Sequence, residues 1–430
     1  MAIPMTTGNI FSSCTDDFEK LNTSNIQVDP ADLPFAAQCT EPMTYCYPPQ
    51  QNMFQFWTNL TIDLYGGYFM TPNGNFTNGD MGENRGHSGG MYENYYLHIF
   101  NNTRRIIAQC DASGERGLSG VMRIVQAYGT LMTTDAYGPI PYSSILSGEN
   151  EVYFEFDSQK DLYKAMLEDL STAITDISAM GADEIAKLKS FDCWCNGDKD
   201  LWVKIANTMK LRMALRLSKR ETEAGNAGMN LKAIATEAAQ NTLAKVNKDI
   251  LIDKSLENEM WLMFNWGDCG FNANLVTIMS GTKDPRQPLY MTLNTGDIKN
   301  EAGTTTVAAN SQYLGIRFAS GLPAKPNSWG NFSGWIQGNN GSSYSMPLPI
   351  MKAAEAYFLL AEAKLRWDIG SESVKNLYEN GIRVSMTNEL AYRGAYAGIK
   401  EYPEGAVDAY INGTSTQIDY TDPIKAELST

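Results

Sequence analysis

The chain has 430 residues, of which 43% are hydrophobic and 11% aromatic, and its formal net charge is −15. This length is enough to bury a large hydrophobic core, as one big domain or two. The acidic balance argues against nucleic acid as a partner, because phosphates attract clustered Lys and Arg. No stretch approaches the roughly 20 apolar residues that a membrane-spanning helix needs.

The first feature along the chain is Cys14, which follows two small serines in "FSSC". Bacterial lipoproteins are cleaved before such a cysteine, which then carries acyl chains worth about 0.8 kcal/mol per buried CH₂. The preceding "MAIPMTTGNI" has neither the basic start nor the apolar core of a working leader. We therefore predict a leader remnant over 1–14 that ends at an acylated Cys14, a tether over 15–24, and a single domain over 25–430.

The other cysteines do not indicate a metal site. The chain has seven cysteines and only two histidines, and no CxxC pair with zinc-site spacing occurs. Cys39 and Cys46 are spaced so that they could pair across a loop. We expect no metal and no cofactor.

Several segments have apolar residues at helical spacing. In 201–217 the stripe contains Trp202, Ala206, Met209 and Met213, and the helix over 160–178 follows a capping box of Ser158 and Asp161. The predicted helices are 50–65, 92–110, 117–133, 160–178, 201–218, 231–246, 351–367 and 371–386. Three consecutive pairs among them, 92–110 with 117–133, 160–178 with 201–218, and 351–367 with 371–386, indicate helical hairpins. We therefore predict an all-α fold of tetratricopeptide-like hairpins with long irregular loops.

The two longest irregular stretches are 66–91 and 303–346, which combine Gly and Asn with aromatic residues. Loops of this length are usually functional or disordered, and disordered segments are poor in aromatics. Aromatic rings stack on sugar rings, and amides and guanidinium groups bond to hydroxyls. The predicted ligand-binding residues are Trp329, Trp335, Tyr68, Asn78, Arg85 and Asn331. The alternative for each ring is that it closes its loop against the core.

One motif suggests catalysis, but the residues around it do not fit the structure that such a catalytic motif requires. "Gly86-His87-Ser88-Gly89-Gly90" matches the nucleophile elbow of serine hydrolases, which must lie between a buried strand and a helix. The polar run before it cannot be a buried strand, and the only other histidine, His98, lies just downstream. We interpret it as a glycine-rich loop, and we predict no catalytic residues.

Five segments, taken together, resemble a known family. "TTDAYGPIPYSS", "FDSQKDLYKAMLEDLSTAI", "WVKIANTMKLRMALRLSK", "DPRQPLY" and "KAAEAYFLLAEAKLR" are similar, in this order, to segments of the SusD/RagB family. These are surface glycan-binding lipoproteins of Bacteroidetes-type bacteria, with a helical, tetratricopeptide-like fold. The resemblance runs from Cys14 to about residue 395. The chain also ends where the family usually continues into further helix, so a C-terminal truncation is expected.

The resemblance implies a non-catalytic glycan-binding lipoprotein, not an enzyme, at the outer membrane and cell surface. Its implied partners are an oligosaccharide or polysaccharide, the membrane through a lipid anchor, and a SusC-like TonB-dependent transporter to which the ligand is delivered for nutrient uptake. Nucleic acid is not an implied partner. Two alternatives stay open at this point: an all-helical glycoside hydrolase, and a helical-repeat scaffold whose ligand is protein.

Overall fold

The computed structural model describes residues 33–47, 51–71, 76, 82, 84–148, 153–252, 258–299, 303–318, 331–338, 345–415 and 420. The predicted leader remnant, the tether and Cys14 lie outside the described residues, as do Asn78 and Trp329. The predicted division of the chain therefore stays a prediction.

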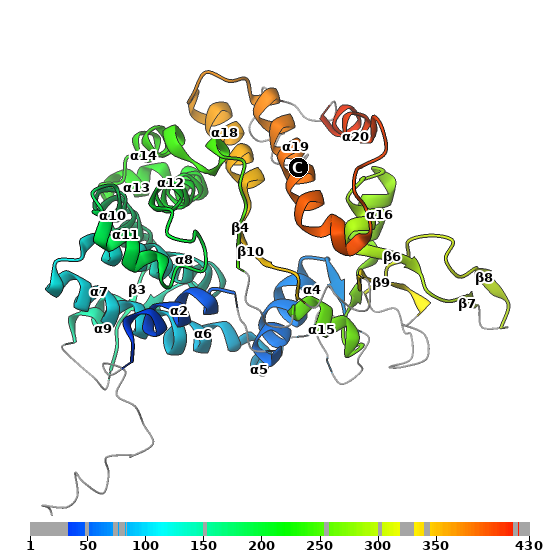
Figure 1. The fold of residues 1–430 in the computed structure, drawn as a ribbon, viewed down its shortest axis with the longest axis horizontal. Coiled ribbons are helices and arrows are strands. Elements are labelled where there is room, and N and C mark those ends of the chain that lie inside the picture. The colour runs from blue at the N-terminus through cyan, green and yellow to red at the C-terminus, as the bar shows by residue number, and fades with distance from the viewer. Residues whose placement is uncertain are drawn as a thin grey trace, which may run out of the picture.

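Helices dominate the first 250 residues, and most of them lie at the left of Figure 1. Two of them, η2 and η4, are π-helical and continue directly into α-helix at both ends. The elements are α2 (Phe35–Tyr45), α3 (Gln51–Met53), η2 (Phe54–Ile62), α4 (Asp63–Tyr65), α5 (Arg85–Ser88), α6 (Gly90–Asn94), η4 (Tyr95–Phe100), α7 (Asn101–Ser113), α8 (Arg116–Tyr137), α9 (Ser143–Ser147), α10 (Gln159–Ser178), α11 (Ala182–Lys189), α12 (Lys199–Arg216), η5 (Leu217–Arg220), α13 (Glu221–Asn226), α14 (Leu231–Ala238), η6 (Ala239–Asn241) and η7 (Leu243–Lys245).

The rest of the chain adds short strands and a final group of helices, which lie at the centre and right of Figure 1. Its helices are α15 (Glu259–Asn265), α16 (Ala273–Gly281), α17 (Gln287–Tyr290), α18 (Ala353–Trp367), α19 (Val374–Ala397) and α20 (Ala406–Ser415). The strands of the whole chain are β1 (Phe69–Met70), β2 (Ile140–Pro141), β3 (Phe156–Asp157), β4 (Ile250–Ile252), β5 (Gly270–Phe271), β6 (Met291–Asn294), β7 (Ile298–Lys299), β8 (Thr305–Val307), β9 (Ser333–Trp335) and β10 (Leu348–Met351).

The strands pair only two at a time. Within the described residues each sheet is an antiparallel pair, namely β1 with β5, β2 with β3, β4 with β10, β6 with β9, and β7 with β8. Such short pairs cannot form a core of their own, because an isolated hairpin is at best marginally stable. The predicted all-α fold class is confirmed.

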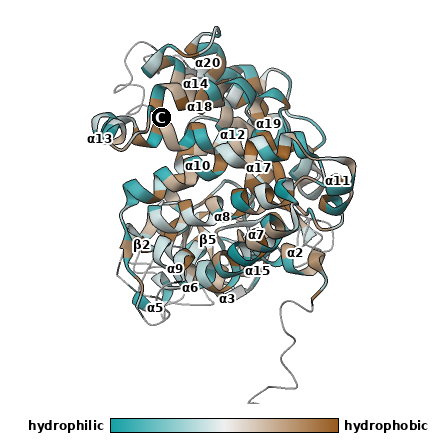
Figure 2. Ribbon diagram, turned by 90° about the vertical axis from the view of Figure 1, so that its left-hand side faces the viewer, coloured by the Kyte–Doolittle hydropathy of each residue, from teal (hydrophilic) through white to brown (hydrophobic). Residues whose placement is uncertain are grey.

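The predicted helical hairpins are also confirmed. α7 packs against α8, α10 packs against α12, and α18 packs against α19, while α10 also contacts α8. The capping box forms at the start of α10, where the backbone N–H of Asp161 donates to Ser158 Oγ at 3.2 Å. Hydrophobic and hydrophilic residues alternate around these helices, which lets each present an apolar side to its neighbours (Figure 2).

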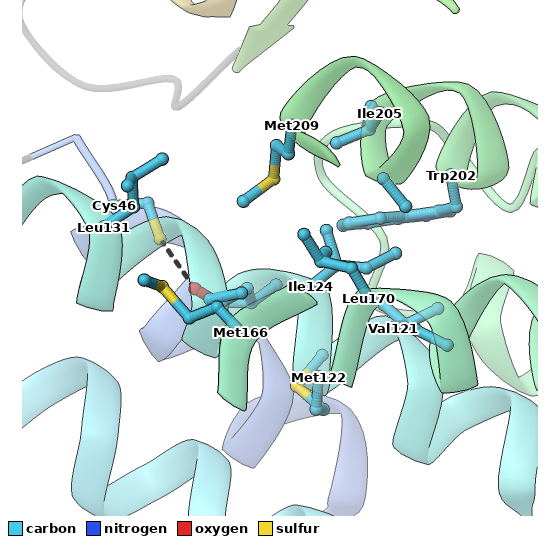
Figure 3. Close-up of a cluster of buried hydrophobic side chains, with 14 of the residues drawn as sticks. Cys46, Val121, Met122, Ile124, Leu131, Met166, Leu170, Trp202, Ile205 and Met209 are labelled. Carbon is cyan, nitrogen blue, oxygen red and sulfur yellow. Dashed lines mark hydrogen bonds between the residues drawn. The ribbon is translucent and has the colours of Figure 1, made fainter. Parts of the chain in front are cut away.

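The main core fills the space between α8, α10 and α12. The stripe predicted over 201–217 is buried there from Trp202 to Met213. Figure 3 shows side chains of α8, α10 and α12 converging on one another, among them Val121, Ile124, Met166, Leu170, Trp202, Ile205 and Met209. Every one of these seven side chains is completely withdrawn from solvent.

The suggested Cys39–Cys46 disulfide is absent from the described residues. Both cysteines are buried, and neither forms a disulfide. The Cys46 thiol instead donates to the carbonyl of Val125 at 3.9 Å (Figure 3), and Cys39 lies in the main core. No described helix combines the length and the hydrophobicity that crossing a bilayer requires.

Gly381 lies where α19 packs closely against Phe358 of α18. A Cβ atom built on Gly381 would lie 2.6 Å from Cε1 of Phe358. We expect Gly381→Leu to destabilise the fold by about 1–3 kcal/mol, the usual cost of overpacking. The cost should fall at the lower end, because Phe358 is 36% exposed and its ring can move aside.

Urea denaturation of Gly381→Leu would measure this effect. Asn376→Leu is the matched control, since Asn376 is exposed on the same helix. If the two variants had equal free energies of unfolding, the expected close packing at Gly381 would be contradicted.

Candidate functional site

An exposed aromatic surface lies where α4 ends and the chain turns into β1. Tyr65 and Tyr68 are 41% and 52% exposed, and Ile62 is 46% exposed. Gly67 provides the turn between them with a φ of +74°, a conformation that residues with a Cβ rarely adopt. Three large side chains are thereby held at the surface within seven residues of chain.

The strand pair β1–β5 fixes the orientation of Tyr68. Phe69 pairs with Phe271, and the carbonyl of Tyr68 accepts from the backbone N–H of Asn272 at 3.0 Å. Neighbouring side chains in an extended segment point to opposite sides. Phe69 accordingly packs against Phe264 and Phe271, at ring distances of 5.9 and 5.5 Å, which leaves Tyr68 on the outer side.

Polar groups surround this turn. The exposed Asn274, at the start of α16, comes so close that its Nδ2 would lie 3.3 Å from a Cβ atom on Gly67. Tyr65 donates from its hydroxyl to the carbonyl of Gly82 at 3.0 Å, which brings the segment just before the exposed Arg85 to the same place. We call Tyr65, Tyr68, Asn274 and Arg85 the turn surface.

Asp63 places a buried carboxyl group beneath this surface, near Tyr47 and Cys269. Its carbonyl accepts from the backbone N–H of Tyr68 at 2.9 Å, while its side chain makes no ion pair within the described part of the chain. Desolvation raises the pKa of Asp63 to about 7, because burial disfavours the charged form. A carboxyl group with this pKa can donate or accept hydrogen bonds near neutral pH.

Trp266 is a further exposed aromatic residue, at the end of α15. It is 37% exposed and precedes Gly267, which has a φ of +66°. The neighbouring Phe264 joins this end of α15 to β1 through its contact with Phe69. Neither Trp266 nor Asn274 was predicted, although the sequence offers one signal for Trp266, an aromatic residue directly before a glycine in "NWGDCG".

The structure differs from the prediction at Trp335. We expected an exposed stacking ring, but Trp335 is only 5% exposed and belongs to a second core cluster with Phe54, Met263 and Phe271. Its ring stacks at 6.3 Å on Phe271, and the Arg393 guanidinium lies 5.3 Å from its centre. Strand β9 directs this side chain into the core, so Trp335 packs against Phe271 of β5 and has no face open to a ligand.

Asn331 also has a structural position. Its Nδ2 donates to the carbonyl of Asp297 at 2.9 Å, and its own carbonyl accepts from the backbone N–H of Thr295 at 3.1 Å. These bonds hold the turn between β6 and β7 against the start of β9. Of the four predicted ligand-binding residues within the described part of the chain, Tyr68 and Arg85 are exposed, whereas Trp335 and Asn331 make structural contacts.

His87, in the supposed nucleophile elbow, has a packing role. Residues 86–90, predicted as a loop, span the end of α5, the turn residue Gly89 and the start of α6. The Asn84 side chain caps α5 by accepting from the backbone N–H of His87. The His87 ring stacks on Phe56 at 4.4 Å. Among the described residues, no three His, Cys, Asp or Glu side chains gather in a way that would hold a metal ion.

Comparisons with known proteins place the chain in a family. The model of the SusD-like family, "Susd and RagB outer membrane lipoprotein", matches residues 19–430. A search of the curated proteins found no match.

Solved structures agree with that family. The chain is similar to a SusD-like protein from Bacteroides thetaiotaomicron, with 26% identity, a TM-score of 0.69, and coverage of 88% of this chain and 72% of that one. A homolog from Bacteroides ovatus has 25% identity and a TM-score of 0.70, over 91% and 74%. A chitin-binding homolog from Flavobacterium johnsoniae has 24% identity and a TM-score of 0.70, over 87% and 72%. The predicted outer-membrane localisation agrees with this family, and the chain therefore belongs to the SusD-like family of outer-membrane lipoproteins, as its motifs indicated.

Proposed function

We propose that this chain binds an oligosaccharide or polysaccharide at the cell surface and delivers it, without catalysis, to a SusC-like TonB-dependent transporter. The observation that carries the proposal is the turn surface, where Tyr68 is exposed directly after Gly67 and the exposed Asn274 amide lies against Gly67. An aromatic face for stacking with polar groups beside it is what a sugar ring requires. Family membership and the chitin-binding homolog support the same class of ligand.

The energetics of the turn surface favour a weak to moderate site. One ring that stacks on a sugar contributes on the order of 1–3 kcal/mol through buried area and the aromatic contact. Tyr65 and Tyr68 together, with hydrogen bonds from Asn274 and Arg85, would reach micromolar affinity only if most of these contacts form at once. Such affinity suits a protein that must release its ligand to a transporter.

We expect Tyr68→Ala to weaken binding by roughly ten- to hundredfold. Because the Tyr68 side chain is 52% exposed, the Tyr68→Ala variant should have the same thermal unfolding midpoint as the parent protein. The measurement is calorimetry with the best ligand from a glycan array. Tyr153→Ala is the matched control, since this tyrosine is 69% exposed on the segment before β3.

The variants Trp329→Ala and Trp335→Ala test whether each of the two remaining aromatic candidates contributes to binding or to stability. Trp335→Ala should lower stability and binding together, because its ring is part of the core. Trp329 lies outside the described residues, and its exposed-turn context in "KPNSWGN" predicts a loss of binding alone. Parental affinity for both Tyr68→Ala and Trp329→Ala would exclude these residues as the site.

Two further experiments test the transporter and the absence of catalysis. Affinity purification of the chain from detergent-solubilised outer membranes should recover a TonB-dependent transporter. Incubation with the best glycan should release no reducing ends. Steady release of reducing ends would instead identify a glycoside hydrolase, and binding of protein without sugar would identify a scaffold.

We expect Cys14 to be acylated when the chain is expressed behind a working leader. The reason is the small serines before Cys14 and the acids Asp16 and Asp17 after it, which resemble the export signal of surface lipoproteins. Intact mass and detergent partitioning of the membrane fraction would measure it. A Cys14→Ala variant that stays equally membrane-bound would contradict this expectation.

A further inference from the structure

The chain turns directly after Asp63, at the point where α4 ends and the turn surface begins. It leaves the helix through a Schellman turn, in which the backbone N–H of Gly67 donates to the Leu64 carbonyl at 3.0 Å and that of Tyr68 donates to the Asp63 carbonyl at 2.9 Å. Gly67 has the positive φ that this turn requires. The backbone of Asp63 therefore holds the backbone of Tyr68 directly.

The side chain of Asp63 lies at the contact between this helix end and the chain that enters β5. Its charge acts on the Cys269 thiol, which directly precedes β5 and accepts from Asn59 Nδ2 at 3.0 Å. Strand β5 pairs with β1, and the backbone N–H of Asn272 then donates to the Tyr68 carbonyl at 3.0 Å. The two segments that hold Tyr68, the end of α4 and the β5 segment, thus come together near Asp63.

No positive charge compensates Asp63 within the described part of the chain, where its side chain makes no ion pair. The elements η2 and β1, which pack on α4, contain no titratable side chain. The charge of Asp63 acts on the Cys269 thiol and on the Tyr47 hydroxyl. Burial keeps the pKa of both groups well above its ordinary value, so both are neutral at pH 7.

The groups behind these two side chains are mostly acidic. They come from α15, from the residues before β5 and from α19, and they are Glu259, Asp268, Tyr392 and Arg393. Only one of these four is a cation, and it already pairs with Glu389 at 2.6 Å. A charge on Asp63 would therefore lie in a desolvated, mainly acidic neighbourhood, at a helix end whose free carbonyl groups are also negative.

These surroundings favour the neutral form of Asp63. Burial raises the pKa of its carboxyl group to about 7. A carboxyl group whose pKa is raised on folding stabilises the fold most below its unfolded pKa of about 3.8, and this contribution is lost as the pH rises toward 7. Asp63 therefore changes from mostly neutral to mostly charged between pH 6 and pH 8.

We propose that Asp63 is a positioning residue for the turn surface: its neutral form holds Tyr68 in the orientation for stacking, and its charged form loosens the turn. A charged carboxylate requires hydration, which it gains as the end of α4 moves away from Cys269 and β5. This movement disturbs the two backbone hydrogen bonds that hold Tyr68. The inference rests on the proposed function for the ligand, but the order of the turn can be measured without any ligand.

Hydrogen exchange of the Tyr68 and Asn272 amides tests the proposal, because these two N–H groups make the bonds on either side of the turn. With a pKa of about 7, the neutral fraction of Asp63 falls from about nine tenths at pH 6 to about one tenth at pH 8. Protection, corrected for the intrinsic rate, should therefore fall about tenfold. Asp63→Asn should keep the protection of the pH 6 parent at both pH values. Asp183→Asn is the matched control, since Asp183 is exposed on α11 and this variant should show the parental change.

Calorimetry with the best glycan from the array extends the test to binding. The parent should bind about tenfold more weakly at pH 8 than at pH 6, because only the ordered turn binds. Asp63→Asn should bind equally at the two pH values, and Asp183→Asn should again behave as the parent.

Three results would overturn the proposal. Equal protection of the parent at pH 6 and pH 8 would do so even if Asp63→Asn failed to fold. A tenfold change that persists in Asp63→Asn would assign the effect to another group. Tighter binding of the parent at pH 8 would mean that the carboxylate contacts the ligand directly. If protection changed as expected but no glycan bound at either pH, the proposed function would fail, whereas the role of Asp63 in the turn would be supported.

Discussion

Trp202→Ala is expected to destabilise the protein by about 3–5 kcal/mol, the range found when a large buried aromatic residue is truncated. Trp202 is completely buried in the main core and stacks on Trp194 at 5.2 Å. Its indole N–H also donates to a carboxylate oxygen of Asp192 at 2.8 Å. The substitution therefore leaves a cavity and removes a hydrogen bond from a buried carboxylate, and both effects act in the same direction.

Urea denaturation followed by far-ultraviolet circular dichroism would measure the change. Trp266→Ala is the matched control, because Trp266 is 37% exposed at the end of α15 and should cost below about 1 kcal/mol. If both variants lost the same free energy of unfolding, the core between α8, α10 and α12 would not be the main source of stability.

The second large effect concerns Glu389, which connects α19 to the start of α18. Its carboxylate accepts from Lys352 at 2.7 Å and from Arg393 at 2.6 Å, and its side chain is only 7% exposed. Arg393 also packs on the rings of Tyr290 and Trp335. The cluster thus joins the helical part of the molecule to the strands near the turn surface.

Stability should depend on the charge of Glu389. Burial by itself would raise the pKa of Glu389, but Arg393 and Lys352 outweigh this effect and lower the pKa to about 2. A carboxyl group with a lowered pKa stabilises the fold above its unfolded pKa of about 4.5, and this contribution is lost as the pH falls toward 2. We expect a loss of about 3 kcal/mol between pH 4.5 and pH 2 from this group.

Glu389→Gln should cost about 3–5 kcal/mol at pH 7, because it leaves Arg393 buried without its counter-charge. The remaining acid dependence should be smaller than in the parent. Glu223→Gln is the matched control, since Glu223 pairs with Arg220 at 2.9 Å in an exposed position. Denaturation curves of the parent and of Glu389→Gln at pH 7, 4.5 and 3 measure this dependence. If both proteins lost stability equally as the pH falls, Glu389 would not be the responsible group.

The sequence by itself determined the helices and their pairing. Trp202 and Met209 recur at helical spacing, and a stripe of this kind is stable only if it is buried against another helix. The capping box at Ser158 was equally local, since all of its atoms belong to residues three apart. The family motifs lie largely on these same helices, so family, fold class and localisation could all be inferred before the structure was known.

Only the tertiary structure decided which loop aromatics are exposed. Tyr68 and Trp335 both lie in long Gly- and Asn-rich stretches, with nothing local to separate them. The pairing of β1 with β5 turns Tyr68 outward, while the Phe271 ring and the Arg393 guanidinium hold Trp335 in the core. Asn274 joins Tyr68 across about two hundred residues of chain. Whether a loop residue is buried depends on partners distant in sequence, so no local pattern determines it. Helical periodicity, in contrast, can be recognised within each short stretch of the chain.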